Sequence, residues 1–490
     1  MFAVTTSVAM IGADPRPVRI EAHVGRAKEA FVLVGLPDTA VREAKERVRA
    51  AIISSGKDFP RRWVTVNLSP ADLPKAGADY DLPIALGVLA AAGEIPARST
   101  QVVAVGELSL DGSVRRSRAA VGAALLAGRR RLPCVVAETD AAMAARVPGV
   151  IVYPVASLAE AAAVVAGNQP PRTSPPEPAM TEPVVDDLSD VRGQPIARRA
   201  LEIAAAGGHH LLMVGSPGAG KTMLARRLPG LLPDLSPEEA VEVACLYAAA
   251  DRPRPFSLRP PYRAPHHSAS AAAVVGGGNG YPVPGELSLA HCGVLFMDEL
   301  GEFGPFLLNN LRQPLEEGKV TIARRGAALT FPARAQVVAA SNPCPCGFKG
   351  DRIRGCRCTD TALERYRRRL SGPFLDRFDL RIFVPSPDAA QLLGPPGEGT
   401  ATVRQRVEAA RRRQAARGKL NSQLRRAELD HKELDPAGRR LLEKALATGF
   451  LTGRGADRVR RVARTLADLA GSEEVGEEHL AEALAYRASL

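Results

Sequence analysis

The stretch Gly215-Ser216-Pro217-Gly218-Ala219-Gly220-Lys221-Thr222 decides the fold of this 490-residue chain. It matches the pattern G-x-x-x-x-G-K-[ST] in full, in which glycines let backbone N–H groups surround phosphates. An apolar run, residues 210–214, precedes it, and a helical pattern continues from Met223. This order of strand, turn and helix predicts a phosphate-binding loop. We expect Lys221 to reach the β- and γ-phosphates of ATP, and Thr222 to hold Mg²⁺.

Two further apolar runs end in polar residues. Residues 294–297 are followed by Asp298 and Glu299. We expect Asp298 to orient Mg²⁺ through water, and Glu299 to polarise the attacking water as a general base. Residues 336–341 are followed by Asn342, which is expected to contact the γ-phosphate or the lytic water. Taken alone, such residues are ordinary turn formers. The phosphate loop upstream favours the catalytic interpretation.

The pattern of apolar runs divides the chain into four parts. Strand and helix signals alternate up to about residue 385, which predicts an α/β fold with a parallel sheet flanked by helices at 188–385. Residues 386–490 are Arg-rich and helical, and we expect an α-helical lid there. Residues 1–167 predict a separate α/β domain. The Pro-rich residues 168–187 are typical of an extended linker.

Composition narrows the class of protein without deciding the partner. The net charge is +12 and the pI is about 9.6, which fits either a nucleic-acid partner or arginine on solvated faces. No apolar run approaches the ~18 residues of a membrane span, and no basic, apolar leader opens the chain. We therefore expect a cytoplasmic protein with no membrane partner.

Four of the seven cysteines are clustered as two C-x-C pairs, Cys344 with Cys346 and Cys356 with Cys358. Four cysteines suit a tetrahedral zinc site, although C-x₂-C is the more usual spacing. Reduced thiols and a redox pair are the alternatives. His266 and His267 are candidates for metal ligands or for lining the ATP site, and a structural role is the default for both.

The three motifs in this order resemble those of AAA+ ATPases. At the level of individual residues, the sequence resembles the magnesium-chelatase-like branch and, within it, the ComM/YifB family. The matching stretches are residues 264–268, 284–291, 341–347 and 371–380. The resemblance implies a ring, usually a hexamer, that hydrolyses ATP to move along DNA. It implies helicase or branch-migration activity during homologous recombination of incoming DNA, as in natural transformation.

The resemblance also assigns roles to single residues. Arg377 is similar to the arginine finger, which reaches the γ-phosphate of a neighbouring subunit. Arg461 matches the second sensor on the lid, with Arg458 and Arg464 as close alternatives. Residues 320–331 read as a β-hairpin whose tip, Arg324 and Arg325, would contact DNA phosphates in the ring pore. A solvated turn is the alternative for that tip.

The first domain resembles the Lon-protease fold through residues 66–77 and 106–112. Lon-type proteolysis uses a Ser nucleophile and a Lys base. The corresponding places here hold Asp79 and Val121. We therefore predict a proteolytically inactive domain that serves assembly or substrate engagement.

Two rival functions use the same ATPase core. A magnesium-chelatase motor would remodel a partner that inserts Mg²⁺, but the fused Lon-like domain argues against it. A protein-remodelling ATPase or an ATP-dependent protease is the second rival, and the missing Ser–Lys pair argues against proteolysis.

Overall fold

We describe the protein from a computed structural model. It describes residues 1–490 except 36–38, 74, 76, 173–185, 253, 279–281, 325–326, 352–353, 370–371, 430–433 and 488–490. The chain folds into two compact units, one of residues 1–182 and 236–258, the other of residues 183–235 and 259–490. Across the described ranges, no helix combines the length and the apolar character that a membrane crossing requires.

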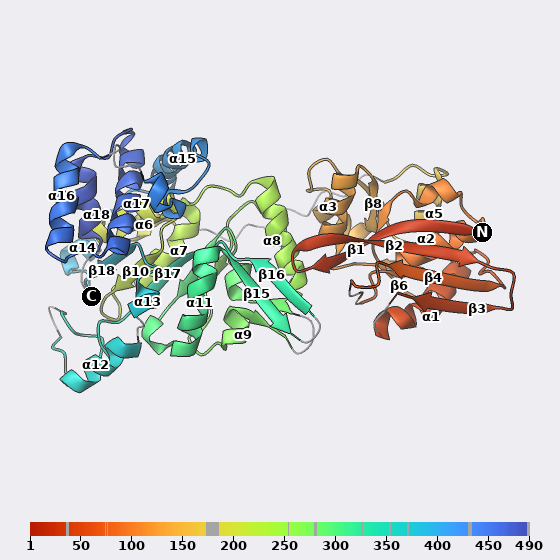
Figure 1. Cartoon of the computed structure of the whole chain (residues 1–490), viewed down its shortest axis with the longest axis horizontal. Coiled ribbons are helices and arrows are strands. Elements are labelled where there is room, and N and C mark those ends of the chain that lie inside the picture. The colour runs from red at the N-terminus through yellow and green to blue at the C-terminus, as the bar shows by residue number, and fades with distance from the viewer. Residues whose placement is uncertain are drawn as a thin grey trace. The chain divides into compact units, whose positions relative to one another are not determined.

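The first unit is built on a seven-stranded mixed sheet in the order β3-β4-β2-β1-β5-β8-β9 (Figure 1). Its strands are β1 (Phe2–Ile11), β2 (Asp14–Val24), β3 (Ala30–Val34), β4 (Trp63–Ser69), β5 (Val103–Ala104), β8 (Pro133–Ala137) and β9 (Ile151–Val155). Neighbours β2 and β4 are antiparallel, whereas β5, β8 and β9 run parallel. The short strands β6 (Glu107–Leu108) and β7 (Val114–Arg115) pair separately.

Within the described part of residues 1–182, the sheet is accompanied by α1 (Thr39–Ser54), α2 (Asp81–Ala92), α3 (Ala120–Arg130), α4 (Glu138–Ala144) and α5 (Leu158–Ala166). Helix α2 is apolar on all sides and is buried along almost its whole length, because it packs against β1 and β2 and also against α1 and α5. On β2, side chains alternate between exposed and buried, with Val18, Ile20 and Ala22 facing the core.

One helix from the middle of the chain belongs to this first unit. Helix α8 (Pro237–Ala249) begins at a capping box formed by Ser236 and Glu239. Its side chains Val241 and Cys245 are buried in an apolar cluster with residues of β5, α3 and β8. The sequence predicted residues 188–385 as one continuous core. The structure differs there, because the apolar face of α8 finds its packing partners in the first unit.

The second unit is built on a five-stranded parallel sheet in the order β11-β14-β17-β10-β18 (Figure 1). Its strands are β10 (Leu211–Val214), β11 (Tyr262–Arg263), β14 (Val294–Met297), β17 (Gln336–Ser341) and β18 (Leu380–Phe383). The predicted parallel sheet is therefore confirmed. Two hairpins lie outside it, β12 (Gly276–Gly277) with β13 (Val283–Pro284), and β15 (Lys319–Arg324) with β16 (Ala327–Pro332).

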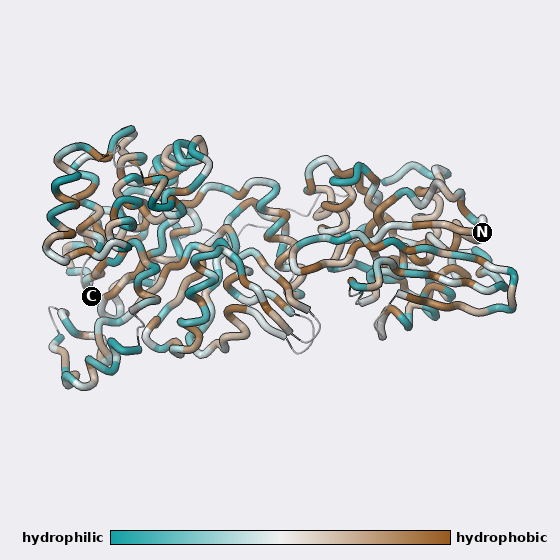
Figure 2. The backbone as a smooth tube through the Cα atoms, viewed as in Figure 1, coloured by the Kyte–Doolittle hydropathy of each residue, from teal (hydrophilic) through white to brown (hydrophobic). Residues whose placement is uncertain are grey.

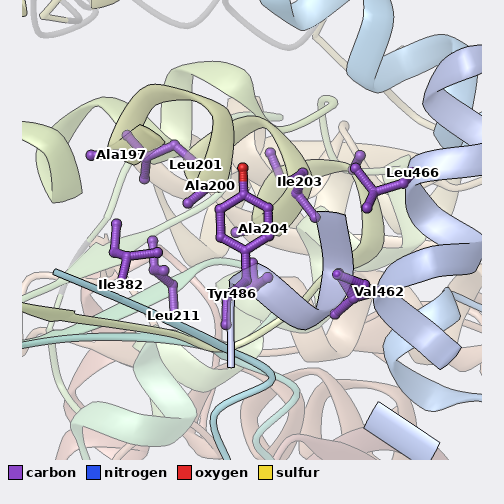
Figure 3. Close-up of a cluster of buried hydrophobic side chains, with 14 of the residues drawn as sticks. Ala197, Ala200, Leu201, Ile203, Ala204, Leu211, Ile382, Val462, Leu466 and Tyr486 are labelled. Carbon is purple, nitrogen blue, oxygen red and sulfur yellow. The ribbon is translucent and has the colours of Figure 1, made fainter. Parts of the chain in front are cut away.

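The longer helices of this unit are α6 (Pro195–Gly207), α7 (Lys221–Leu231), α11 (Pro305–Glu317), α12 (Asp360–Arg369), α15 (Thr400–Ala416), α16 (Pro436–Ala447), α17 (Gly453–Ala470) and α18 (Glu477–Ala485). One apolar cluster joins the sheet, α6 and the C-terminal helices. Figure 3 shows Leu201, Val462, Leu466 and Tyr486 around a common centre. The turns of these C-terminal helices alternate in hydropathy in Figure 2, as expected for helices with one buried face.

Two adjacent histidines tie the sheet to its surroundings. The ring of His209 lies 2.9 Å from Asp379 Oδ2 and 2.8 Å from Thr465 Oγ1 on α17. His210 Nδ1 accepts a hydrogen bond from the backbone N–H of Val337 at 2.9 Å. Loss of hydration lowers the pKa of His210 to about 4. The neutral ring is therefore the form that fits the fold.

We expect acid to weaken the fold through His210. The unfolded ring binds a proton below its usual pKa of about 6.5, whereas the folded ring resists protonation down to about pH 4, so stability falls as pH drops through this window. Between pH 7 and pH 4.5 the contribution is about 2–3 kcal/mol. The free energy of unfolding, from denaturant titrations at both pH values, should change less in His210→Asn. An equal pH dependence in the two proteins would contradict this.

Candidate functional site

The glycine-rich loop leaves β10 at its carboxyl end and enters α7 at Lys221. Gly218 and Gly220 take left-handed φ angles of 82° and 87°, and a Cβ at either position would meet no atom within 4 Å. Gly215 is restricted differently, since a Cβ there would lie 2.1 Å from the carbonyl oxygen of Val384. The loop therefore needs glycine for backbone conformation and close approach, and it leaves open space where we expect phosphates to bind.

Lys221 is buried at the centre of this loop. Its Nζ donates to the carbonyl oxygens of Gly215 at 2.6 Å and Ser216 at 3.0 Å. Burial lowers the pKa of Lys221, and the charges of Asp298 and Glu299 oppose that shift. Ser216 Oγ is buried without a hydrogen-bond partner among the described residues. A triphosphate in the loop would satisfy both groups, so this chain's own residues fit ATP.

The neighbouring strand ends bring the predicted acid and amide to the loop. Thr222 Oγ1 donates to Asp298 Oδ2 at 2.7 Å, directly after β14. Lys221 Nζ lies 3.4 Å from Asn342 Oδ1, directly after β17. A hydroxyl beside a carboxylate is an oxygen pair of the kind that Mg²⁺ takes as ligands or through water. Residues 215–222, Asp298 and Asn342 thus lie together as the sequence placed them.

Glu299 has a partner that the sequence did not identify. Its backbone is left-handed, with φ of 51°, and its N–H donates to Asp298 Oδ1 at 2.9 Å. Its carboxylate Oε2 lies 3.0 Å from Nδ1 of His267. His266 points elsewhere, to Ser268 Oγ at 2.7 Å. His267 therefore restrains the half-exposed carboxylate that we expect to act on water.

Two more residues of the site were missed. Tyr366 on α12 is buried, and its hydroxyl lies 3.2 Å from both Ser341 Oγ and the carbonyl oxygen of Asn342. Gln194, left-handed just before α6, donates through Nε2 to the carbonyl oxygens of Pro385 at 2.7 Å and Ala219 at 3.3 Å. The sequence could have indicated Gln194, because a glycine before it and a proline after it are typical of the start of a helix.

Arg377 does not join this group within its own chain. It is mostly buried, and its guanidinium contacts Glu316 Oε1 at 2.5 Å and the carbonyl oxygen of Pro373 at 3.0 Å. Burial lowers its pKa, while Glu316 opposes the shift. The described structure therefore holds Arg377 against α11, and its recorded contacts are not with the phosphate loop.

The three arginines of α17 that the sequence singled out have separate partners. Arg461 Nε donates to the carbonyl oxygen of Leu424 at 2.7 Å, and Arg464 pairs with Asp468 at 3.0 Å. Arg458 pairs with Asp379 at 3.0 Å, and its charge also acts on Arg377. The recorded contacts of the predicted sensor Arg461 are not with the phosphate loop. Of the three arginines, Arg458 is the one whose charge lowers the pKa of Arg377.

The four clustered cysteines converge. Their sulfur atoms all lie within 4.8 Å of one another, and Cys344 is the buried member. Hydrogen bonds from the backbone N–H groups of Arg357 and Phe348 lower the pKa of Cys346 to about 6. The loop that carries them starts two residues after Asn342 and ends before α12.

Two other predicted positions, Asp79 and Val121, belong to the first unit. Asp79 carries a hydrogen bond with Ser117 near the start of α3, and Val121 is buried on α3. That these two positions correspond to the Lon dyad stays a prediction. Burial raises the pKa of Asp79.

Arg324 ends β15, but its side chain and all of Arg325 lie outside the described residues.

We expect His267→Ala to lower ATP hydrolysis about tenfold, because a misdirected Glu299 loses the geometry that near-attack positioning requires. His266→Ala is the matched control, since its ring nitrogen binds Ser268 instead. Steady-state rates should fall in the first variant and change much less in the second, with ATP affinity preserved in both. Equal rates for all three proteins would show that the contact is incidental.

Comparison with known proteins covers almost the whole chain. The family "magnesium chelatase, subunit ChlI" matches residues 187–392, its C-terminal part matches 397–487, and "subunit ChlI of Mg-chelatase" matches 20–140. The chain is 44% identical to the uncharacterized protein YifB of Escherichia coli (strain K12), over 98% of this chain and 96% of that protein.

A second relative, the competence protein ComM of Haemophilus influenzae (strain Rd), is 43% identical over 99% of this chain and 97% of its own length. A weaker likeness, 32% identity over 29% of this chain and 28% of the other, links it to Lon protease 2 of Bacillus subtilis (strain 168). The chain therefore belongs to the ComM/YifB family of magnesium-chelatase-like proteins.

Proposed function

We propose that this protein is an ATP-driven ring motor that acts on DNA, with helicase or branch-migration activity in the homologous recombination of incoming DNA. The observation that carries the proposal is the cluster of Lys221, Thr222, Asp298 and Asn342 at one edge of the parallel sheet. A relative named as a competence protein, matched end to end, supports the link to DNA uptake.

The residues divide the chemistry of ATP hydrolysis among them. The backbone N–H groups of residues 218–221 and Lys221 Nζ bind the β- and γ-phosphates. Glu299 accepts the proton of a water molecule whose oxygen attacks the γ-phosphorus, while the bond to ADP breaks. Asn342 orients that water or the γ-phosphate. Mg²⁺ held through Thr222 and Asp298 supplies charge neutralisation when it is bound.

Within one chain, Arg377 is paired with Glu316, and its recorded contacts among the described residues are not with the phosphate loop. A ring, which we take to be a hexamer, completes the ATP site by placing Arg377 of one subunit at the nucleotide of the next. In this proposal Arg461 is the lid sensor, with Arg458 and Arg464 as the alternatives. Residues 1–167 form a proteolytically inactive Lon-like domain that engages substrate or supports assembly.

A magnesium-chelatase-like motor is the alternative function, because the matched family carries that name. A protein-remodelling ATPase is the other. The net charge of +12 agrees with DNA as the partner, and so do Arg324 and Arg325, which lie in sequence where β15 ends and before β16 begins.

Mixed subunits test the shared site. We expect Lys221→Ala to reduce hydrolysis at least about 100-fold through lost charge stabilisation. Arg377→Ala should reduce it about 1,000-fold or more. An equimolar mixture should recover activity, since about a quarter of randomly formed interfaces combine an intact Lys221 with an intact Arg377. If co-assembled mixtures stay as inactive as either variant, Arg377 does not act across an interface.

DNA dependence separates the motor from its rivals. Single-stranded DNA should stimulate hydrolysis, and the stimulation should weaken as salt rises, because phosphate contacts release counterions. The double variant Arg324→Ala/Arg325→Ala should lose the stimulation and keep the basal rate. Arg439→Ala/Arg440→Ala, an exposed pair on α16, is the matched control. Stimulation by a protein partner alone, with none by DNA, would favour the remodelling alternatives.

A further inference from the structure

The loop between β17 and α12 carries four thiols that the proposed chemistry does not use. Cys344 Sγ lies 3.4 Å from Cys346 Sγ and 3.7 Å from Cys356 Sγ, and Cys346 and Cys356 are also 3.7 Å apart. Cys358 lies within 4.8 Å of the other three. Zinc–sulfur bonds of about 2.3 Å in a tetrahedron place sulfur atoms about 3.8 Å apart. The spacing is therefore that of a tetrahedral cage.

The surroundings of the thiols suit thiolate ligands. Backbone N–H groups point at the sulfur atoms, from Lys349 to Cys344 at 3.3 Å and from Phe348 and Arg357 to Cys346. Left-handed Gly347 and Gly350 make the tight turns that allow this. Cys356 is exposed, so a metal ion can reach the cage from solvent. Four sulfur ligands in a tetrahedron select zinc or iron over Mg²⁺.

The four cysteines lie in the segment that connects Asn342, beside the phosphate loop, to α12. Cys344 follows Asn342 by two positions, and Gly347 packs so closely on the phosphate loop that a Cβ there would lie 2.7 Å from Pro217 Cδ. On the other side, Cys358 is followed by α12, whose Tyr366 hydroxyl binds the carbonyl oxygen of Asn342. A metal ion bound by both C-x-C pairs would cross-link the two ends of this loop.

We propose that Cys344, Cys346, Cys356 and Cys358 bind one structural Zn²⁺, which fixes Asn342 and α12 against the phosphate loop. Binding displaces protons from those thiols that carry them, and no sulfur is oxidised. The ion closes a loop of the chain and so restrains the backbone on both sides of Asn342. The zinc site itself is independent of the proposed DNA motor, whereas the restraint on ATP hydrolysis rests on the ATPase activity.

Metal analysis of the full chain tests the site. The parent protein, purified under reducing conditions, should hold about one zinc per chain. Cys356→Ser and Cys358→Ser, which alter the more exposed ligands, should lower zinc retention at least about tenfold after dialysis against a chelator. Cys292→Ser, a cysteine of the same unit outside the cage, should retain the ion. A colourless cobalt(II)-reconstituted protein, visible iron absorption, or a disulfide with no metal would each overturn the assignment.

Amide hydrogen exchange tests the restraint without relying on activity. In Cys356→Ser, residues 342–351 and α12 should exchange at least about tenfold faster than in the parent, while β1 and β2 stay unchanged. Faster exchange throughout the chain would indicate general unfolding, and Cys358→Ser would then be measured in its place. Loss of zinc with unchanged exchange at α12 would overturn the restraint and leave the metal site standing. If the parent protein retains zinc but its ATP hydrolysis is not stimulated by DNA, the result counts against the proposed DNA motor and not against the zinc site.

Discussion

The parallel register of three strands is the constraint on which the site depends. Val214 pairs with Ser341, and Met297 pairs with Ala339, so β10, β14 and β17 end at one edge of the sheet. Side chains that follow these strands therefore emerge together. The C-terminal helices and α6 bury the apolar cluster behind this edge. His209 links β18 and α17 to the same sheet, because its ring contacts Asp379 just before β18 and Thr465 on α17.

Motifs with short spacing could be predicted from the sequence because their geometry is local. The glycines and Lys221 occupy one turn between a strand and a helix, and the family resemblance agrees with the chain-length matches to YifB and ComM. Asp298 and Asn342 could be placed because each ends an apolar run, and parallel strands bring such ends to one edge. The mixed α/β architecture followed from the same alternation.

Other features depend on contacts between residues far apart in the chain. His267 meets Glu299 through a loop that carries no periodicity, and Tyr366 on α12 meets Asn342 through the packing of that helix on the end of β17. Neighbouring arginines on α17 share one sequence pattern, so helical spacing does not tell Arg458 from Arg461. The pairing of Arg377 with Glu316 likewise arises from α11, a helix distant in sequence.

Helix α8 has a consequence for how the protein can be divided. The backbone passes from one unit to the other at residues 182–183, 235–236 and 258–259. A fragment that starts after the Pro-rich segment carries α8 away from its cluster, leaving Val241 and Cys245 uncovered, while the complementary fragment keeps a gap beside α3. Neither piece holds all the residues of its compact unit, so a division of the chain at the Pro-rich segment separates residues 236–258 from the apolar cluster that they complete.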